Sequence, residues 1–64
     1  MRINGEEKHI DNSVKLSELL LELGYDIERV AVEKNGEIVP KRLFLETVVC
    51  DADRLEVVRF VGGG

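Results

Sequence analysis

Apolar residues follow two different periods along this chain, one typical of strands and one typical of a helix. At the start, Met1 and Ile3 alternate with polar residues, and the dipeptide Asn4-Gly5 is typical of a tight hairpin turn, which predicts a returning strand over residues 6–10. Leucines then recur at intervals of three and four, at positions 16, 19, 20 and 23. This spacing predicts one helix over residues 16–23, with an apolar stripe and a stop at Gly24.

The second half of the chain returns to the strand period. Val30 and Val32 alternate with other residues, and Asn35-Gly36 predicts a second hairpin turn into a short strand, residues 37–39. Pro40 ends that strand because proline cannot donate to a sheet. Residues 41–49 have no regular period and are interpreted as one helical turn followed by a loop. A last strand is expected from Arg54 onward. Its two faces are Leu55 and Val57 on one side, and Glu56, Val58 and Phe60 on the other.

The order of elements is strand, strand, helix, strand, strand, strand. Because crossover connections are right-handed, we expect the last strand to lie parallel to the first, in the middle of the sheet. This arrangement is the β-grasp or ubiquitin-like fold of the α+β class, a mixed five-strand sheet with one main helix on one face. The leucine stripe is then expected to cover Met1, Ile3, Val30, Val32, Leu55 and Val57. The face that carries Val58 and Phe60 is left uncovered.

Composition narrows the possible functions. The 64 residues correspond to one domain, in which we expect residues 1–61 to form the fold and residues 62–64 a flexible glycine tail. With 13 acidic and 9 basic residues the net charge is −4, which argues against nucleic-acid binding. No apolar run approaches the roughly 20 residues of a membrane span, and the start lacks the pattern of a signal peptide. A single cysteine is typical of a reducing compartment, so we expect a cytoplasmic protein.

Few side chains offer catalytic chemistry. One histidine, His9, and one cysteine, Cys50, are too few for a His/Cys metal site, and His9 is interpreted as a solvated strand residue. Asp51 and Asp53 disfavour the Cys50 thiolate, so Cys50 is interpreted as a small half-buried residue rather than a nucleophile. The two aspartates are interpreted as turn residues rather than a cation site. We therefore expect a protein that is not an enzyme, with no catalytic residue, metal site or cofactor of its own.

The sequence closes with "RFVGGG", and a run of glycines has no role in stabilising a fold. It is either an inert end or a means of threading the terminal carboxylate into a narrow site of a partner. That carboxylate is ionised at neutral pH and can attack the α-phosphorus of ATP. Residues 61–64, fully extended, reach at most about 13–14 Å. Val58 and Phe60 on the uncovered face are expected to anchor the partner.

Several segments together resemble the ThiS family, the sulfur carriers of thiamin thiazole biosynthesis: the "NG" hairpin, the leucine helix ending at Gly24, "VEKNGEIVPK", "CDADRLEVV" and "FVGGG". The resemblance spans the whole chain. It implies that Gly64, preceded by Gly62 and Gly63 in the tail, is adenylated by an E1-like, ThiF-like adenylyltransferase that uses ATP and magnesium. Sulfur from a cysteine desulfurase or another donor then gives a thiocarboxylate, which a ThiG-like thiazole synthase consumes.

The residues leave two alternatives open. A terminal Gly-Gly after an apolar strand is shared with ubiquitin and with the small subunits of molybdopterin synthase, so the chain could carry sulfur for molybdopterin or cysteine synthesis. It could also be a β-grasp interaction module that is not a carrier. The chain departs from the family's pattern at Lys15, where a threonine often caps the helix, and only Glu18 of that capping box is present. Gly62 is an additional glycine where some members have another small residue.

Overall fold

The computed structural model describes residues 1–60, so the predicted tail at residues 62–64 lies outside the described residues. Seven strands, one α-helix and two 3₁₀ helices make up the described part of the chain. In chain order they are β1 (Arg2–Ile3), β2 (Glu6–Glu7), β3 (Val14–Lys15), α1 (Leu16–Glu22), η1 (Ile27–Arg29), β4 (Val30–Lys34), β5 (Glu37–Val39), η2 (Lys41–Leu43), β6 (Val48–Val49) and β7 (Arg54–Arg59).

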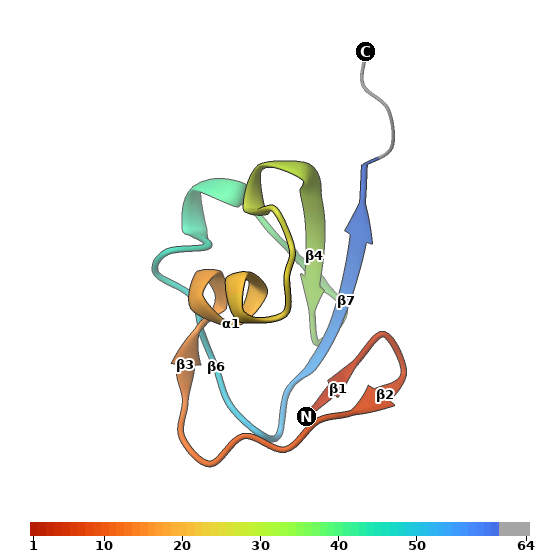
Figure 1. The fold of residues 1–64 in the computed structure, drawn as a ribbon, viewed down its shortest axis with the longest axis vertical. Coiled ribbons are helices and arrows are strands. Elements are labelled where there is room, and N and C mark those ends of the chain that lie inside the picture. The colour runs from red at the N-terminus through yellow and green to blue at the C-terminus, as the bar shows by residue number, and fades with distance from the viewer. Residues whose placement is uncertain (61–64) are drawn as a thin grey trace.

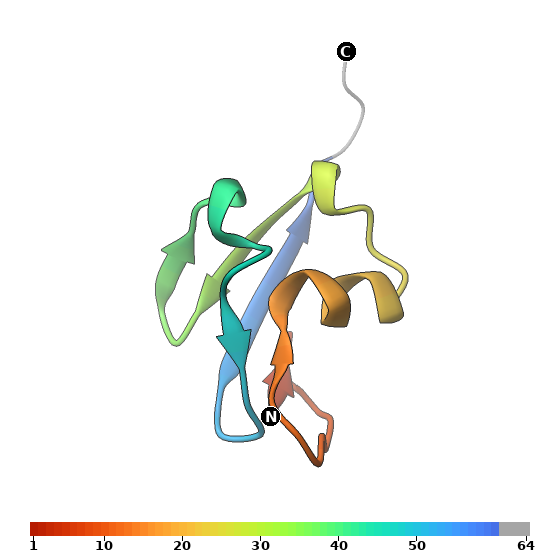
Figure 2. The same cartoon turned by 90° about the vertical axis from the view of Figure 1, so that its left-hand side faces the viewer.

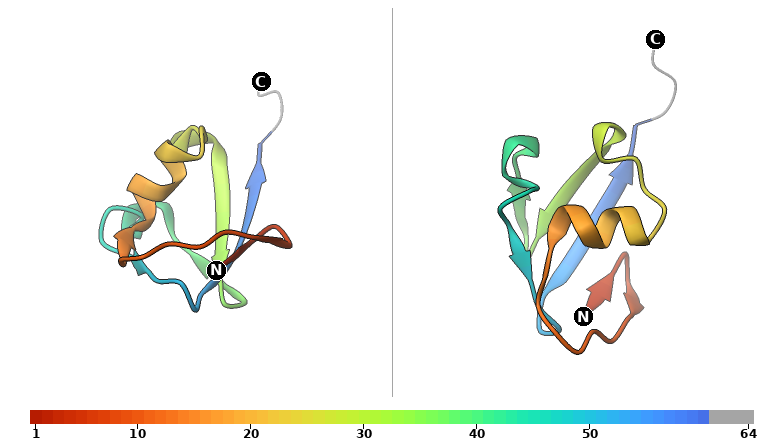
Figure 3. Two further views of the ribbon diagram at one scale, coloured as in Figure 1. Left: turned by 60° about the horizontal axis from the view of Figure 1, so that its bottom comes forward. Right: turned by 60° about the vertical axis from the view of Figure 1, so that its left-hand side comes forward.

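The main sheet has five strands in the order β2-β1-β7-β4-β5. Strand β7 pairs in parallel with β1 and antiparallel with β4, so the last strand lies in the middle beside the first. Helix α1 lies over one face of the sheet, beside β4 and β7 (Figure 1). The views from other directions in Figures 2 and 3 show the helix over this same face. The prediction of a mixed five-strand β-grasp sheet with one main helix is therefore confirmed.

Both predicted hairpin turns are present. Asn4 and Gly5 have φ values of 52° and 83°, and Asn35 and Gly36 have φ values of 53° and 87°. Asparagine and glycine are the residues that adopt positive φ most readily, which is why these dipeptides mark the turns in the sequence. The turns join β1 to β2 and β4 to β5 in antiparallel pairs.

Helix α1 forms where the leucine period predicts it, although it ends at Glu22, one residue earlier than expected. Lys15 occupies the N-cap position, as expected, and its side chain makes no capping hydrogen bond. At the other end, the N–H of Tyr25 donates to the carbonyl of Leu20 and Gly24 has a φ of 89°. This is the left-handed glycine stop that ends many helices.

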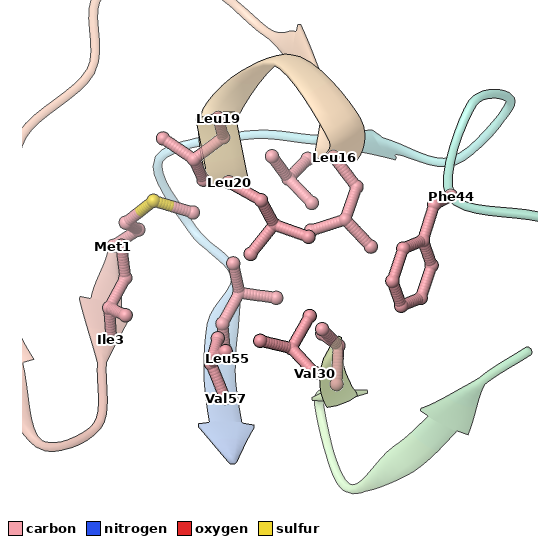
Figure 4. Close-up of a cluster of buried hydrophobic side chains, with 11 residues drawn as sticks. Met1, Ile3, Leu16, Leu19, Leu20, Val30, Phe44, Leu55 and Val57 are labelled. Carbon is pink, nitrogen blue, oxygen red and sulfur yellow. The ribbon is translucent and has the colours of Figure 1, made fainter. Parts of the chain in front are cut away.

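The core lies between α1 and the inner face of the sheet. Every residue predicted beneath the leucine stripe is buried, and Figure 4 shows Met1 and Leu55 directed toward the leucines of α1. Phe44 and Val49 are buried as well, and the sequence did not predict them as core. Leu23 is only partly buried at the edge of the cluster. No helix within residues 1–60 is long and apolar enough to span a membrane.

The short elements differ from the prediction in three places, one of them a predicted strand that is too long and the others elements that were not predicted. The returning strand was expected over residues 6–10, but β2 stops at Glu7, so His9 lies outside a strand. Residues 14–15 and 48–49 form a second, two-stranded sheet, with Val14 opposite Val49. A 3₁₀ helix, η1, precedes β4. Segments of two or three residues are too short to establish a period, so their structure depends on contacts with the rest of the fold.

Candidate functional site

Strand β7, which precedes the glycines in the sequence, is held on both sides by asparagine side chains from the two hairpin turns. Asn4 Oδ1 accepts from the N–H of Val57 at 2.7 Å, and Asn4 Nδ2 donates to the carbonyl of Val57 at 3.2 Å. At the start of the strand, Asn35 Oδ1 accepts from the N–H of Arg54 at 2.9 Å. At its end, the N–H of Phe60 donates to the carbonyl of Arg29 at 2.8 Å. The strand is therefore fixed along its whole length.

The outer face of the sheet, away from α1, carries exposed apolar side chains. The prediction that Val58 and Phe60 face away from the core is confirmed, since they are 61% and 58% exposed. Val58 lies opposite Ala31 of β4. Ile38 of β5 is 76% exposed and was not predicted as part of this surface. Its position follows from the register, which places Ile38 opposite the outward-facing Glu33. We call Ile38, Val58 and Phe60 the apolar patch.

On the inner face of the sheet, the last residue of β7, Arg59, makes a cation–π contact. The Arg59 guanidinium lies 4.5 Å from the centre of the Tyr25 ring, in the segment that follows α1. The direction of Arg59 agrees with strand alternation, since Val58 and Phe60 point to the opposite face. Exposed cation–π contacts of this kind contribute about 0.5–1 kcal/mol. Arg59 thus ties the end of the strand to the helical side of the fold.

Asp51 is more than the turn residue that the sequence predicts. Its Oδ1 lies 2.9 Å from the amino-terminal ammonium of Met1 and accepts from the N–H of Ile10 at 3.0 Å. The hydrogen bond from the ammonium, followed by the one from Ile10, lowers the pKa of Asp51 to about 2. This carboxylate therefore joins the start of the chain to the loop before β7.

Asp53 belongs to a different set of contacts. Partial burial opposes its ionisation, but hydrogen bonds from Asn35 Nδ2 and the N–H of Cys50, with Lys34 nearby, outweigh it and lower the pKa of Asp53. Cys50 is half-buried, which agrees with its interpretation as a small packed residue. Asp53 thus secures the turn that leads into β7.

His9 is 73% exposed, as predicted, and its two ring nitrogens lie 2.9 Å from Asp11 Oδ1 and 3.4 Å from Asp51 Oδ2. No cluster of three or more histidine, cysteine or carboxylate side chains in residues 1–60 has the geometry of a metal site.

The predicted sulfur-carrying residue, Gly64, and the tail residues Gly62 and Gly63 lie outside the described residues. The features described around the end of the fold are therefore a fixed strand and an exposed apolar patch.

Comparison with known proteins identifies the family to which the chain belongs. The ThiS family model matches residues 1–64. The sulfur carrier protein ThiS of Bacillus subtilis is 35% identical over the whole chain and 98% of that protein. A thiazole synthase of Paramagnetospirillum magneticum is 52% identical over 97% of this chain, which spans only 19% of that longer relative.

Solved structures agree with the sequence comparison. The crystal structure of the thiamine biosynthesis protein ThiS from Geobacter metallireducens has a TM-score of 0.81 and 38% identity, covering 98% of this chain and 96% of that one. The resemblance inferred from the hairpins, the leucine helix and the closing glycines is confirmed, as is the expectation of a carrier rather than an enzyme. The chain belongs to the ThiS family of sulfur carriers in thiamin biosynthesis.

Proposed function

We propose that this chain carries sulfur for thiazole formation as a thiocarboxylate on Gly64. The observation that carries the proposal is the match to the ThiS family over the whole sequence, including the closing glycines. The group that is activated is the carboxylate of Gly64, whose carbonyl carbon becomes the acyl carbon. The glycines before it can pass through a channel that any Cβ would obstruct. The fixed strand β7 supports the same function, because it holds the residues before the tail in one direction.

The proposed chemistry takes place in the sites of partner enzymes. A Gly64 carboxylate oxygen attacks the α-phosphorus of ATP in an E1-like adenylyltransferase, and pyrophosphate leaves with its magnesium. A thiol reductant releases the persulfide sulfur of a cysteine desulfurase, or another donor supplies the sulfur, at the oxidation level of sulfide; this sulfur attacks the acyl carbon, AMP leaves, and the thiocarboxylate forms. Thiazole synthase then takes the sulfur from the thiocarboxylate. The carrier supplies the acyl group and the surface that positions it, and the partners supply the catalytic residues and cofactors.

Docking of the adenylyltransferase is assigned to the apolar patch. Val58 and Phe60 are exposed on the sheet face that no other element of residues 1–60 covers, and they lie directly before residues 61–64 in the sequence. Exposed apolar side chains grouped on one face are typical of protein interaction sites. A partner that binds there would hold its active site within reach of the tail. We expect these reactions to take place in the cytoplasm.

A thiazole synthase partner is supported by the relatives. A region similar to this chain forms part of a Paramagnetospirillum magneticum protein named thiazole synthase, and a second such protein comes from Magnetococcus marinus. When two functions are joined in one polypeptide, the effective concentration of one for the other is high. We infer that this chain meets a thiazole synthase in the same reaction sequence.

Intact mass spectrometry tests the proposal. The chain is incubated with the E1-like adenylyltransferase of the same organism, ATP, magnesium, a cysteine desulfurase, cysteine and a thiol reductant. Replacement of one carboxylate oxygen by sulfur should add about 16 Da to the carrier. Deletion of Gly64, or addition of one residue after it, should abolish this product without changing the fold, whereas Cys50→Ser should leave the product intact.

The same experiment separates the alternatives. A mass shift that depends on Cys50 and survives the carboxyl-terminal extension would mean that sulfur is held as a persulfide, and the proposal would be wrong. No shift under any condition would favour an interaction module. A thiocarboxylate that supports molybdopterin or cysteine synthesis, and not thiazole formation with purified thiazole synthase, would assign the carrier to another pathway.

A further inference from the structure

The register of the main sheet places two carboxylates directly opposite each other on its outer face. Glu33 of β4 pairs with Glu56 of β7, and both side chains are exposed. On the other side of Glu33, the register places Ile38 of β5. The two glutamates therefore lie in one row with a member of the apolar patch, and Val58 is the next outward residue along β7.

This pair is unfavourable for the isolated protein. Like charges directly opposite each other on neighbouring strands destabilise a sheet. In the part of the chain that the structure describes, neither Glu33 nor Glu56 forms an ion pair, whereas Arg2 pairs with Glu7 and Lys41 with Glu28. Arg54 is diagonal to Glu33 and two residues before Glu56, but it forms no ion pair with either. Arg54 lines the same surface hollow as the two glutamates, but neither carboxylate is held in an ion pair within residues 1–60, so both can accept from a group of a partner.

The neighbouring side chains indicate what kind of group that is. Ile38 and Val58 are exposed and apolar, so a partner that covers this row must also be apolar at those positions. Neighbouring strands lie about 4.8 Å apart, which is close enough for one guanidinium to donate to carboxylates on both strands. An arginine on an apolar surface is thus the complementary partner chemistry.

We propose that Glu33 and Glu56 form an acidic clamp for one basic side chain, preferably arginine, on the apolar docking surface of the adenylyltransferase. This inference rests on the proposed function, because it concerns the surface through which the carrier meets that enzyme. The apolar patch supplies contact area, and the acidic clamp selects partners that place a positive charge between β4 and β7. Binding relieves the repulsion between the two carboxylates, so the pair contributes to the complex although it disfavours the free fold.

The test compares charge removal at the clamp with matched charge removal elsewhere. Binding of the carrier to the purified E1-like adenylyltransferase of the same organism is measured by calorimetry without ATP, at low and at high salt. For Glu33→Gln/Glu56→Gln we expect binding about tenfold weaker at low salt, which corresponds to about 1.4 kcal/mol, and a smaller salt dependence. The control variant, Glu22→Gln/Glu46→Gln, makes the same change in net charge at two exposed positions outside β4 and β7, and should bind like the wild type.

Thermal unfolding of the free variants provides the second measurement. Because the clamp variant removes a repulsion, its melting temperature should equal or exceed that of the wild type. Unchanged affinity of the clamp variant, or equal weakening by the control variant, would overturn the proposal. Thiocarboxylate formation is assayed separately by mass. If wild-type carrier forms the thiocarboxylate while the clamp variant binds normally, only the clamp is wrong. If no thiocarboxylate forms, the proposed function is wrong, whatever the binding data.

Discussion

Asn4 provides a quantitative test of how strand β7 is held in place. Strand β1 ends at Ile3, and the Asn4 amide group pairs with both the N–H and the carbonyl of Val57, which a longer β1 would otherwise reach. Asn4 also has a φ of 52°, in the left-handed region. Asn4→Ala removes both hydrogen bonds to Val57 and the longer one from Asn4 Nδ2 to the Tyr25 hydroxyl at 3.5 Å. It also places alanine, which has no side-chain amide to compensate, in the left-handed conformation.

The size of the effect follows from these contacts. Two hydrogen bonds contribute about 1 kcal/mol each to the free energy of unfolding. Holding alanine in the left-handed region adds a cost of about 1 kcal/mol. We therefore expect Asn4→Ala to lower the free energy of unfolding by about 3 kcal/mol. For a domain of this size the total is roughly 3–10 kcal/mol, so the variant should be close to unfolding.

Asn4→Gly separates the two causes. Glycine adopts positive φ without strain, while its greater freedom in the unfolded chain offsets part of that advantage. We expect a loss of about 2 kcal/mol for this variant, mainly from the hydrogen bonds. Asn12→Ala is the control, because Asn12 is exposed in a loop and has no side-chain hydrogen bond within residues 1–60.

Urea unfolding followed by far-UV circular dichroism at pH 7 measures all of these variants, with the denaturant slope as a check on two-state behaviour. If Asn4→Gly costs less than about 0.5 kcal/mol, the amide does not hold β7 and the reasoning from its contacts is refuted. If Asn4→Gly and Asn4→Ala cost the same, the backbone contribution is absent.

Three other predictions follow from burial and charge. Leu20 lies on the buried face of α1, so Leu20→Ala should cost about 2–5 kcal/mol in urea unfolding, and a loss below about 0.5 kcal/mol would show that the leucine stripe is not core. The pKa of Asp51 is about 2 in the folded protein against an ordinary 3.8, so as pH falls the unfolded chain binds this proton first. The stability that Asp51 contributes is therefore complete above about pH 5 and is lost between about pH 4 and 2. Asp51→Asn should make the acid decline of the melting temperature shallower, and an unchanged decline would contradict the contact with the amino terminus. Phe60→Ala should leave the melting temperature nearly unchanged while weakening adenylyltransferase binding; unfolding of this variant would mean that Phe60 is core.

The parts of the fold that the sequence predicted are those set by local rules. Asn-Gly at positions 4–5 and 35–36 identifies both hairpins because the turn needs positive φ at adjacent residues. The leucine period locates α1 to within one residue. Alternation along β7 places Val58 and Phe60 on the exposed face, and the crossover rule places β7 beside β1.

The parts that the sequence did not predict depend on contacts between distant segments. Phe44 is buried in a stretch without a period, and its backbone carbonyl accepts from the N–H of Ser17 at 3.1 Å. The contact of Asp51 with the amino terminus joins residues 50 positions apart. The face of Ile38 depends on the register with β4, because a strand of three residues does not establish its own face. These features required the three-dimensional fold.

The central position of β7 has a consequence for synthesis of the chain. Strands β1 and β4 do not pair with each other; each pairs with β7, which the ribosome makes last among the strands of residues 1–60. Residues 1–53 alone therefore have two separate hairpins and no strand to join them. Such a topology has many contacts between distant residues, which slows folding, and the sheet can close only after residues 54–59 have emerged. The apolar patch and the proposed acidic clamp both need β7, so a nascent or truncated chain would lack the complete surface that is proposed to bind the adenylyltransferase.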